Sequence, residues 1–428
     1  MSSPVNTETA PPRQSKLLSP AASKKSKIAF FGIFGMQNLG NECTLQAILH
    51  NAREQLPGRE IYGISYGPDD TSRRHNITSV AVSQQNFDGV VRRSGLARLL
   101  RICRRIPGEL SDWVKTVRIL RGTDLVVMTG TGMLTDYSTN AVGFPYSVFR
   151  WAVAARLAGC KVRFVGVCVG PIYERLSRFF IRHALSLADY RSFRDQFSKN
   201  RIAKLCFDSG RDPVFPDLAF SLPMNLFPQR PNRTRRTRQV GLGVMDHRDV
   251  HLSNPNEHQA EYSAYLEKMC DFVSWLVEHG YAVRILQGDA KHDRSTRAEL
   301  KARLERRGIR YDQAGITDED TTTVEELLAQ LAKVDIIVSP RFHNLLLGLM
   351  LNIPVVSISY DPKNDALLDG FGLSKYRQAL ADLDVQKLIH QFMDLEVRAD
   401  ELTPTFSKKA AEYRGLLEEQ YHSIFGDM

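Results

Sequence analysis

The sequence predicts an α/β protein built from two Rossmann-like domains that face a cleft. Short apolar runs, typical of strands buried on both faces, alternate with amphipathic segments of helical length. A stretch rich in proline and arginine at residues 223–238 divides this alternation into two series. A chain of 428 residues is also too long for one hydrophobic core and suits two domains of ordinary size.

The first series predicts an N-terminal Rossmann-like domain over residues 27–222. Residues 1–26 are rich in Ser, Pro, Thr, Ala and Lys, so we expect a disordered leader without a role in the fold. The first strand is expected from Lys27, where an apolar run ends at Gly35. Further strands are expected at residues 61–66, 124–129 and 161–169, and helices at 44–56, 146–158 and 176–188.

The second series predicts a C-terminal Rossmann-like domain over residues 239–375, after a linker at 223–238. Strands that alternate with helices imply parallel sheets covered on both faces. Residues 376–428 are expected to form C-terminal helices, the last of which can cross back to the first domain. The expected strands are 240–245, 282–287, 334–338 and 355–360, and the expected helices are 262–278, 324–333 and 344–351.

The composition is that of a globular protein, with 43% hydrophobic and 25% charged residues. The formal net charge is +9, and the excess gathers at residues 92–121 and 233–238. The first stretch interleaves arginines with leucines and isoleucines, which predicts either a solvated helix face or a basic amphipathic helix on an anionic membrane. Neither stretch lies in a nucleic-acid-binding motif, so we expect no nucleic acid among the partners.

The cysteines and apolar segments indicate a cytoplasmic protein. Six cysteines are scattered without a CxxC pair or zinc-finger histidines, so we expect reduced thiols and no metal site. The N-terminus lacks the apolar core of a signal peptide. The most apolar later stretch, residues 336–360, contains Arg341, His343 and Asn344, so no membrane-spanning segment is expected.

A first glycine-rich turn follows the first strand and leads into a helix. It runs over residues 32–42 and contains Gly35, Asn38 and Glu42. Such turns bring backbone N–H groups to bear on anions, or they simply allow close packing. The turn fits neither GxGxxG nor the P-loop, so the sequence supports neither a nicotinamide cofactor nor ATP.

A second glycine-rich turn, residues 129–136, follows the strand expected at 124–129. Ligands of doubly wound sheets bind in the crevice at such strand ends. Gly130 and Gly132 lie within this turn, and Asp136 ends it. Asp136 either holds a sugar hydroxyl or caps a helix.

Four basic side chains lie where strands are expected to end. Arg194 closes a strand before a helix that starts at Asp195, and it serves either a structural ion pair or an anionic ligand. Arg341 and His343 stand between a buried strand and an apolar helix, where burying them unpaired is costly, so we favour a ligand-binding role. Lys363 follows the next strand and either adds charge to the site or is simply solvated.

Taken together, four segments resemble the polysaccharide pyruvyl transferase family over residues 27–375: GIFGMQNLGNE, TGTGMLTD, ADYRSFRDQFS and SPRFHNLLLGLMLNIPVVSISYDPK. The last is the most specific, with RxH, an apolar helix, a Pro-led strand and YDxK in the family's arrangement. Asn41 and Thr131 depart from the family pattern. The resemblance implies a glycosyltransferase-B-like pair of Rossmann domains.

The resemblance also implies an activity. Phosphoenolpyruvate would be the co-substrate, with no other cofactor, and its transfer to two hydroxyls of a sugar would give a cyclic pyruvate ketal and phosphate. The acceptor would be a saccharide, lipid-linked in exopolysaccharide biosynthesis and met at the cytosolic face of the membrane. The implied donor site is Arg194, Arg341, His343 and Lys363. Catalysis would rest on Arg194, Arg341 and His343, with His343 as the acid. The acceptor wall would comprise Gly35, Asn38, Glu42, Gly130, Gly132 and Asp136, with Glu42 binding hydroxyls or acting as base.

Two other functions remain open on the sequence alone. A glycosyltransferase that uses a nucleotide sugar shares the expected architecture, and fold alone does not decide function. A non-catalytic, basic scaffold of polysaccharide assembly on the membrane would also suit the charge. Binding of phosphoenolpyruvate rather than a nucleotide sugar separates the first from a pyruvyl transferase. Lipid binding that is insensitive to loss of His343 would favour the second.

Overall fold

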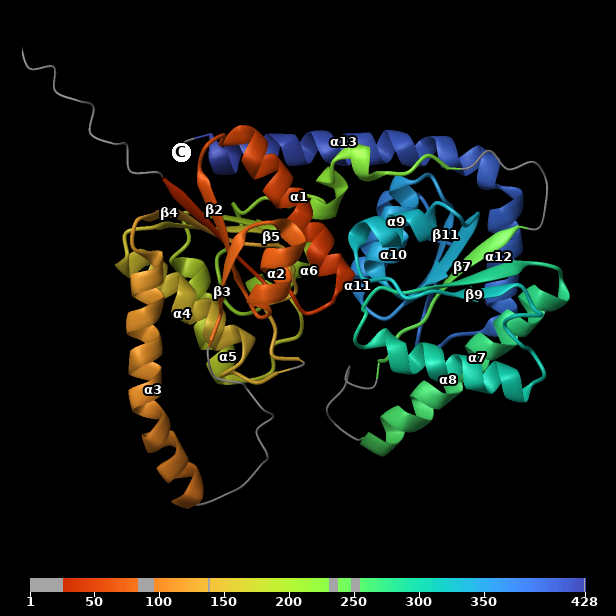
Figure 1. Cartoon of the computed structure of the whole chain (residues 1–428), viewed down its shortest axis with the longest axis horizontal. Coiled ribbons are helices and arrows are strands. Elements are labelled where there is room, and N and C mark those ends of the chain that lie inside the picture. Colours follow the sequence, from red (N-terminus) through yellow and green to blue (C-terminus); the bar gives the residue numbers. More distant parts are fainter. Residues whose placement is uncertain (1–25, 84–95, 138, 231–237, 248–254, 427) are drawn as a thin grey trace, which may run out of the picture.

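The computed structural model describes residues 26–83, 96–137, 139–230, 238–247, 255–426 and 428. Two parallel six-stranded sheets stand side by side, each covered by helices (Figure 1). The predicted α/β architecture of two Rossmann-like domains is therefore confirmed. Residues 1–25 of the expected leader, 92–95 of the basic stretch and 233–237 of the arginine cluster lie outside the described residues.

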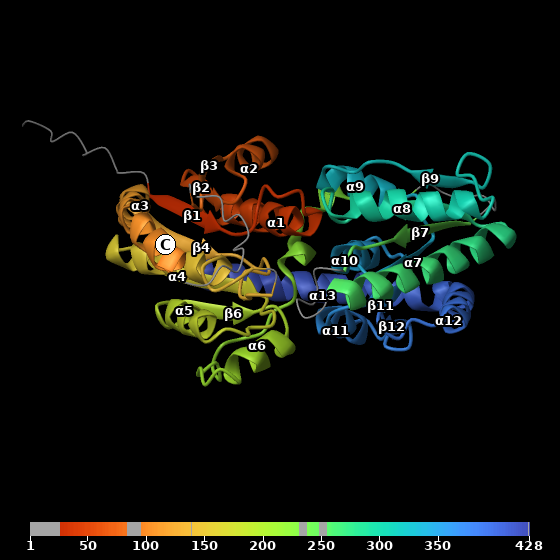
Figure 2. The same ribbon diagram turned by 90° about the horizontal axis from the view of Figure 1, so that it is seen from below.

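The N-terminal sheet has the strand order β3-β2-β1-β4-β5-β6. Successive strands step outward from β1 in one direction and then the other, so right-handed crossovers place α1 and α2 on one face and α3, α4 and α5 on the other (Figure 2). The strands are β1 (Lys27–Phe31), β2 (Glu60–Ser65), β3 (Thr78–Ala81), β4 (Thr123–Met128), β5 (Lys161–Val167) and β6 (Tyr190–Phe193). The helices are α1 (Leu39–Gln55), α2 (Pro68–His75), α3 (Leu96–Leu120), α4 (Phe144–Leu157), α5 (Arg175–Ser186) and α6 (Gln196–Ala203).

The C-terminal sheet repeats the topology with the order β12-β11-β10-β7-β8-β9. Two short 3-10 helices, η1 (Leu218–Ser221) and η2 (Met224–Leu226), precede it. The strands are β7 (Gln239–Gly243), β8 (Ala282–Leu286), β9 (Ile316–Asp318), β10 (Ile336–Ser339), β11 (Val355–Ser359) and β12 (Arg377–Ala379). The helices are α7 (Pro255–Glu278), α8 (Asp293–Arg306), α9 (Val324–Leu331), α10 (Phe342–Met350), α11 (Pro362–Gly370), α12 (Val385–Val397) and α13 (Ala399–Phe425).

One strand lies where helices were expected. β12 pairs in parallel with β11, so the sheet extends into the range 376–428, which the sequence predicts as helical. Its sequence, Arg-Gln-Ala, offers three residues and no apolar run. A polar edge strand of this length obtains its structure from the neighbouring strand rather than from its own side chains.

One hydrophobic core runs through both domains. Alternate residues of β1 divide between the two faces of the sheet: Ala29 and Phe31 pack under α4 and α5, whereas Ile28 and Phe30 join a core that continues into the C-terminal domain. The helices α1, η1, α10 and α13 carry this shared core between the sheets. None of the helices in the described part of the chain is long and apolar enough to cross a bilayer.

The long helix α13 crosses from the C-terminal domain back to the N-terminal domain (Figure 1). Gln420 donates to Ser192 Oγ at 2.6 Å, and Arg163 donates to the Ile424 carbonyl. The Tyr421 hydroxyl lies 2.8 Å from Ser221 Oγ and is fully buried. The helix therefore fastens the two domains to each other from behind the cleft.

We expect Tyr421→Ala to lower the free energy of unfolding by about 3–5 kcal/mol, because it removes a buried aromatic ring at the domain junction. Tyr421→Phe keeps the ring and removes the hydroxyl bond to Ser221, so its cost should be about 1 kcal/mol. Urea unfolding of both variants measures the difference. Equal effects of the two substitutions would contradict the assignment of the stability to ring packing.

Candidate functional site

The first glycine-rich turn lies at the junction of the two domains. Leu39 N donates to the Gly288 carbonyl at 3.1 Å, and Ala290 N donates to the Gln37 carbonyl at 2.9 Å. The Asn38 side chain caps α1 by accepting from Asn41 N, and its Nδ2 donates to Asp289 Oδ2 at 3.1 Å. Asn38 therefore both starts α1 and ties the turn to the C-terminal domain.

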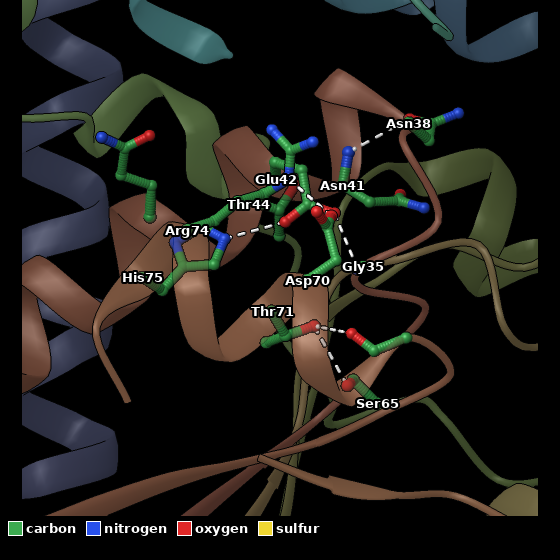
Figure 3. Close-up of polar contacts among 12 residues, drawn as sticks. Gly35, Asn38, Asn41, Glu42, Thr44, Ser65, Asp70, Thr71, Arg74 and His75 are labelled. Carbon is green, nitrogen blue, oxygen red and sulfur yellow. Dashed lines mark hydrogen bonds and ion pairs between the residues drawn. The ribbon is translucent and has the colours of Figure 1, made fainter. Parts of the chain in front are cut away.

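Glu42 is buried beneath the same turn (Figure 3). Its Oε1 accepts from Gly35 N at 2.9 Å, and its Oε2 lies 2.8 Å from His75 Nε2. Gly35 has φ +71°, and a Cβ there would meet the Gly67 carbonyl oxygen at 2.0 Å, so only glycine suits the position. The carboxylate that the sequence assigns to the acceptor wall thus holds the turn in shape.

The second glycine-rich turn lies beside the first, because β4 neighbours β1. Thr131 Oγ1 accepts from Ile33 N at 3.2 Å, which joins the two turns. A Cβ on Gly130 would meet the Gly166 carbonyl oxygen at 2.5 Å, whereas Gly132 is open on its Cβ side.

Asp136, at the end of this turn, accepts backbone N–H groups where the chain enters α5. Its Oδ1 lies 2.9 Å from Tyr173 N, and its Oδ2 lies 2.8 Å from Glu174 N. Asp136 is therefore not a helix cap itself, because α5 has Glu174 as its N-cap, but it holds the two residues that precede this helix.

Arg194, Asp217 and His343 come together between the domains. Arg194 follows β6, and its Nη1 donates to Asp217 Oδ2 at 2.8 Å. His343 enters from the first turn of α10 in the C-terminal domain, and its Nε2 lies 3.7 Å from Asp217 Oδ1. That distance suits an ion pair and is too long for a hydrogen bond. One carboxylate therefore faces a guanidinium and an imidazole from different domains.

A cavity of about 270 Å³ adjoins this cluster. Arg194, Asp217, Phe342 and Lys363 line it together with residues from the start of α6 and from α13. The Arg194 guanidinium lies 5.0 Å from the centre of the Phe342 ring, and Lys363 Nζ lies 4.7 Å from the centre of the Tyr360 ring. Both cations are thus fixed against aromatic faces at the edge of the cavity.

Arg341 is held on the other side of the strand end. Its Nη2 donates to the fully buried carboxylate of Asp293, at the start of α8. A Cβ on Gly288 would come within 2.9 Å of Arg341 Cγ, so this glycine makes room for the side chain. The Asp293 carboxylate also accepts from Gly288 N at 2.9 Å, which fixes the loop against which Arg341 lies.

His343 packs on the first turn of α1 across the domain junction. A Cβ on Gly40 would approach His343 Nδ1 to 2.1 Å, so the ring occupies the space that any other residue would fill. The helix that the first glycine-rich turn introduces therefore meets the RxH motif directly. This contact joins the two segments that the sequence places on opposite walls of the cleft.

The charges of the site stabilise one another. Burial alone would raise the pKa of Asp217, but Arg194 and His343 hold it below its ordinary range. Burial would lower the pKa of Arg194, but Asp217 and Asp195 help to raise it. Burial opposes the charge of Lys363 as well, and Tyr360 and Asp361 raise its pKa above the ordinary value. The three groups are therefore ionised at neutral pH.

Three buried nitrogen atoms of the basic residues at the strand ends form no hydrogen bond in the described part of the chain: Arg194 Nε, Arg341 Nε and His343 Nε2. Burying such groups unpaired is costly. Each belongs to a side chain that a carboxylate holds at another atom or, for His343, at ion-pair distance. The arrangement can accept a small anion that carries several oxygen atoms.

The sequence singled out four basic residues of the cluster and missed Asp217. Arg194, His343 and Lys363 gather around Asp217 and the cavity, while Arg341 lies beside Asp293. The acceptor candidates do not form one cluster, because Asn38 and Glu42 lie at the junction and Asp136 lies at the start of α5. Asp217 ends the segment Asp-Pro-Val-Phe-Pro-Asp, which follows the Arg194 motif. An acidic residue in this proline-containing segment was the only sequence signal for Asp217.

Comparison with known proteins gives a family match and a set of structural neighbours. The family model described as polysaccharide pyruvyl transferase matches residues 38–362. No curated protein sequence matches the chain. Structurally, 94% of the chain aligns with 100% of a UDP-GlcNAc 2-epimerase from Neisseria meningitidis bound to UDP-GlcNAc, at 11% identity and a TM-score of 0.55.

Two further neighbours have the same architecture. A UDP-GlcNAc 2-epimerase from Methanocaldococcus jannaschii is 11% identical, with a TM-score of 0.54, and the alignment covers 86% of this chain and 91% of that one. A glycosyltransferase from Rickettsia africae is 12% identical, with a TM-score of 0.52, and the alignment covers 94% and 98%. At these identities the likeness shows the fold alone, and it confirms the glycosyltransferase-B-like pair of domains.

We expect Asp217→Asn to lower the free energy of unfolding by about 3–5 kcal/mol, because it leaves the buried Arg194 without its carboxylate. The folded pKa of Asp217 is lowered, so its contribution is fully present above its unfolded pKa of about 4 and fades as the pH falls toward the folded value. As the pH falls, the free energy of unfolding should therefore decrease less in the variant than in the wild type.

The matched control is Asp195→Asn. Asp195 Oδ2 lies 3.8 Å from Arg194 Nε, and an asparagine there can still cap α6, so the cost should stay below about 1 kcal/mol. Urea unfolding between acid and neutral pH measures both variants. If the two substitutions lower the free energy of unfolding equally, the Arg194–Asp217 pair does not stabilise the protein more than the Arg194–Asp195 contact does.

Proposed function

The chain belongs to the polysaccharide pyruvyl transferase family, and we propose that it transfers the enolpyruvyl-derived group of phosphoenolpyruvate to two hydroxyls of one sugar. The observation that carries this proposal is a set of buried nitrogen atoms, on Arg194, Arg341 and His343, that form no hydrogen bond with the described residues. Phosphoenolpyruvate presents a phosphate and a carboxylate on one enol carbon, so several fixed cations are what its recognition requires.

Arg194, Arg341 and Lys363 would hold the donor. Two of them line the cavity of about 270 Å³, and Arg341 approaches from the adjoining strand end. A guanidinium held at one nitrogen by a carboxylate keeps its remaining N–H groups in a fixed plane, which suits a phosphate or carboxylate. Ketal formation neither oxidises nor reduces the substrate, so the proposal includes no further cofactor.

His343 would be the general acid. In the first step a sugar hydroxyl adds to the enol carbon, and a proton from His343 converts the methylene into a methyl group. The bond between this carbon and the phosphate oxygen then breaks. A second hydroxyl of the same sugar forms the other C–O bond and closes the ketal. The proton of the first hydroxyl leaves with phosphate, and the proton of the second returns to His343. Asp217 Oδ1 lies 3.7 Å from His343 Nε2 and would help to keep the ring in place.

The acceptor would approach from the N-terminal domain, where the glycine-rich turns meet His343 through Gly40. The side chains of Asn38, Glu42 and Asp136 are engaged in the protein's own hydrogen bonds. We therefore assign acceptor contacts in this region to backbone groups of the turns, and to Asn38 and Glu42 the shaping of the first turn. A saccharide, lipid-linked in an exopolysaccharide precursor, is the acceptor class that we propose.

A nucleotide sugar is the competing donor, because the Neisseria neighbour is described with UDP-GlcNAc bound. Phosphoenolpyruvate, at a concentration well above its dissociation constant, should raise the unfolding midpoint by several degrees, because it binds the folded state alone. UDP-GlcNAc should leave the midpoint unchanged. Differential scanning fluorimetry of the whole chain measures both ligands, and stabilisation by the nucleotide sugar alone would favour a glycosyltransferase.

We expect His343→Ala to lower the rate of phosphate release by about 10²–10⁴-fold, because it removes the proposed acid. The matched control is His390→Ala, which changes an exposed histidine of α12 outside the site and should keep the wild-type rate. Phosphate release from phosphoenolpyruvate with a panel of glycosides measures the rate, and mass spectrometry identifies the ketal. A full rate with His343→Ala would remove this residue from the mechanism.

A further inference from the structure

A second cavity, of about 350 Å³, lies on the N-terminal domain away from the donor cavity. Helix α5 forms one side of it, and the residues that follow α6 form the other. Four of its lining side chains are cationic, and an aromatic ring and a histidine lie among them: Arg175, Arg178, Arg182, Lys204, Phe179 and His183. The proposed transfer reaction uses none of these residues.

No described residue neutralises the positive charge of this basic pocket. None of its four Arg and Lys side chains forms an ion pair with a described residue, and α5 itself contains no Asp or Glu. Glu174, directly before the helix, is exposed, and Arg178 donates to the Tyr173 carbonyl at 3.3 Å. His183 Nδ1 lies 2.8 Å from the Phe179 carbonyl oxygen. Four like charges gathered in this way attract an anionic partner.

Apolar side chains are exposed on the same short segment. Tyr173 is 60% exposed, Leu176 50% and Phe179 47%, although all three are large. Single exposed apolar residues are common, but three within seven positions, interleaved with arginines, form an amphipathic face. Arg175, Phe179 and Arg182 recur at helical spacing along it, opposite the buried Ile181 and Leu185.

This face continues across the outer helical layer of the domain. The Phe179 ring lies 6.2 Å from that of Phe149 on α4, which lies 6.4 Å from that of Trp113 on α3. On α3, Leu110 and Val114, which flank Trp113, are 62% and 57% exposed. The helices α3, α4 and α5 lie side by side on one face of the sheet (Figures 1 and 2).

We propose that this face, centred on the pocket between α5 and the end of α6, docks on a membrane of anionic phospholipids. The four cations would contact headgroup phosphates, while Leu176, Phe179 and Tyr173 would enter the boundary between headgroups and acyl chains. A free phosphate or a nucleic acid would use the cations and leave the exposed apolar side chains in water. A membrane surface can contact both the cationic and the apolar side chains.

The position of the pocket suits an acceptor delivered from a membrane. Helix α6 begins at the donor cavity with Gln196 and ends beside the basic pocket with Lys204. Eight helical residues span about 12 Å, so a saccharide attached to a membrane lipid would have a short distance to travel to the cleft. This step rests on the proposed function, whereas membrane binding itself is independent of it.

The test is flotation of the full chain with vesicles made of phosphatidylcholine and phosphatidylglycerol in equal parts. We expect binding that weakens as salt is added, and no binding to vesicles of phosphatidylcholine alone. Arg178→Glu combined with Arg182→Glu should lower the vesicle partition coefficient by about 25-fold or more, since each basic side chain at an anionic surface contributes about fivefold. Leu176→Ser combined with Phe179→Ser should also weaken binding, without changing its dependence on salt.

The matched control is Lys333→Glu combined with Lys387→Glu, which changes the charge equally at exposed positions of the C-terminal domain and should keep the binding. An unchanged unfolding midpoint shows that each variant is folded. Binding that survives loss of both arginines, or that is equal on neutral vesicles, overturns the docking proposal. The vesicle assay contains no phosphoenolpyruvate, so its failure is separate from a failure of the transfer reaction.

Discussion

The ion pair between Arg194 and Asp217 is the interaction on which the site depends. Both side chains are buried in the N-terminal domain, and His343 brings a third ionisable group against the same carboxylate from the C-terminal domain. Removing charges from water is costly, and their mutual attraction offsets this only when the geometry is fixed. The continuous core through α1, η1, α10 and α13 supplies that fixed geometry, because it holds the two sheets at one spacing.

Two glycines near the pair make room for the side chains of the RxH motif, Gly40 across the domain junction and Gly288 within the C-terminal domain. Gly40 lets the His343 ring lie on the first turn of α1, and Gly288 lets the stem of Arg341 lie on the loop before α8. Backbone hydrogen bonds between residues 37–39 and 288–290 also join the two domains. A larger side chain at position 40 would push His343 away from Asp217, and one at position 288 would displace the stem of Arg341.

Most of the architecture could be predicted from periodicity, because strands such as β1 carry apolar residues on both faces and differ clearly from surface segments. The edge strand β12 could not, since its three residues carry no such pattern. At the site, the basic residues were recognisable as poor core residues at strand ends. Asp217 was not, because its role comes from a partner 23 positions away in sequence, Arg194, and a second one in the other domain.

Glu42 and Asp136 lie in the segments in which the sequence places acceptor contacts. Their carboxylates nevertheless accept hydrogen bonds from backbone N–H groups of the protein. A glycine-rich turn gains freedom to approach a ligand and loses the side chains that would hold its shape. Glu42 supplies that hold through Gly35 N, and Asp136 through Tyr173 N and Glu174 N. The donor side differs, because each arginine donates a hydrogen bond to a carboxylate from one nitrogen and keeps an Nε that forms no hydrogen bond with the described residues. A lysine at either position would keep the charge and lose this fixed second donor.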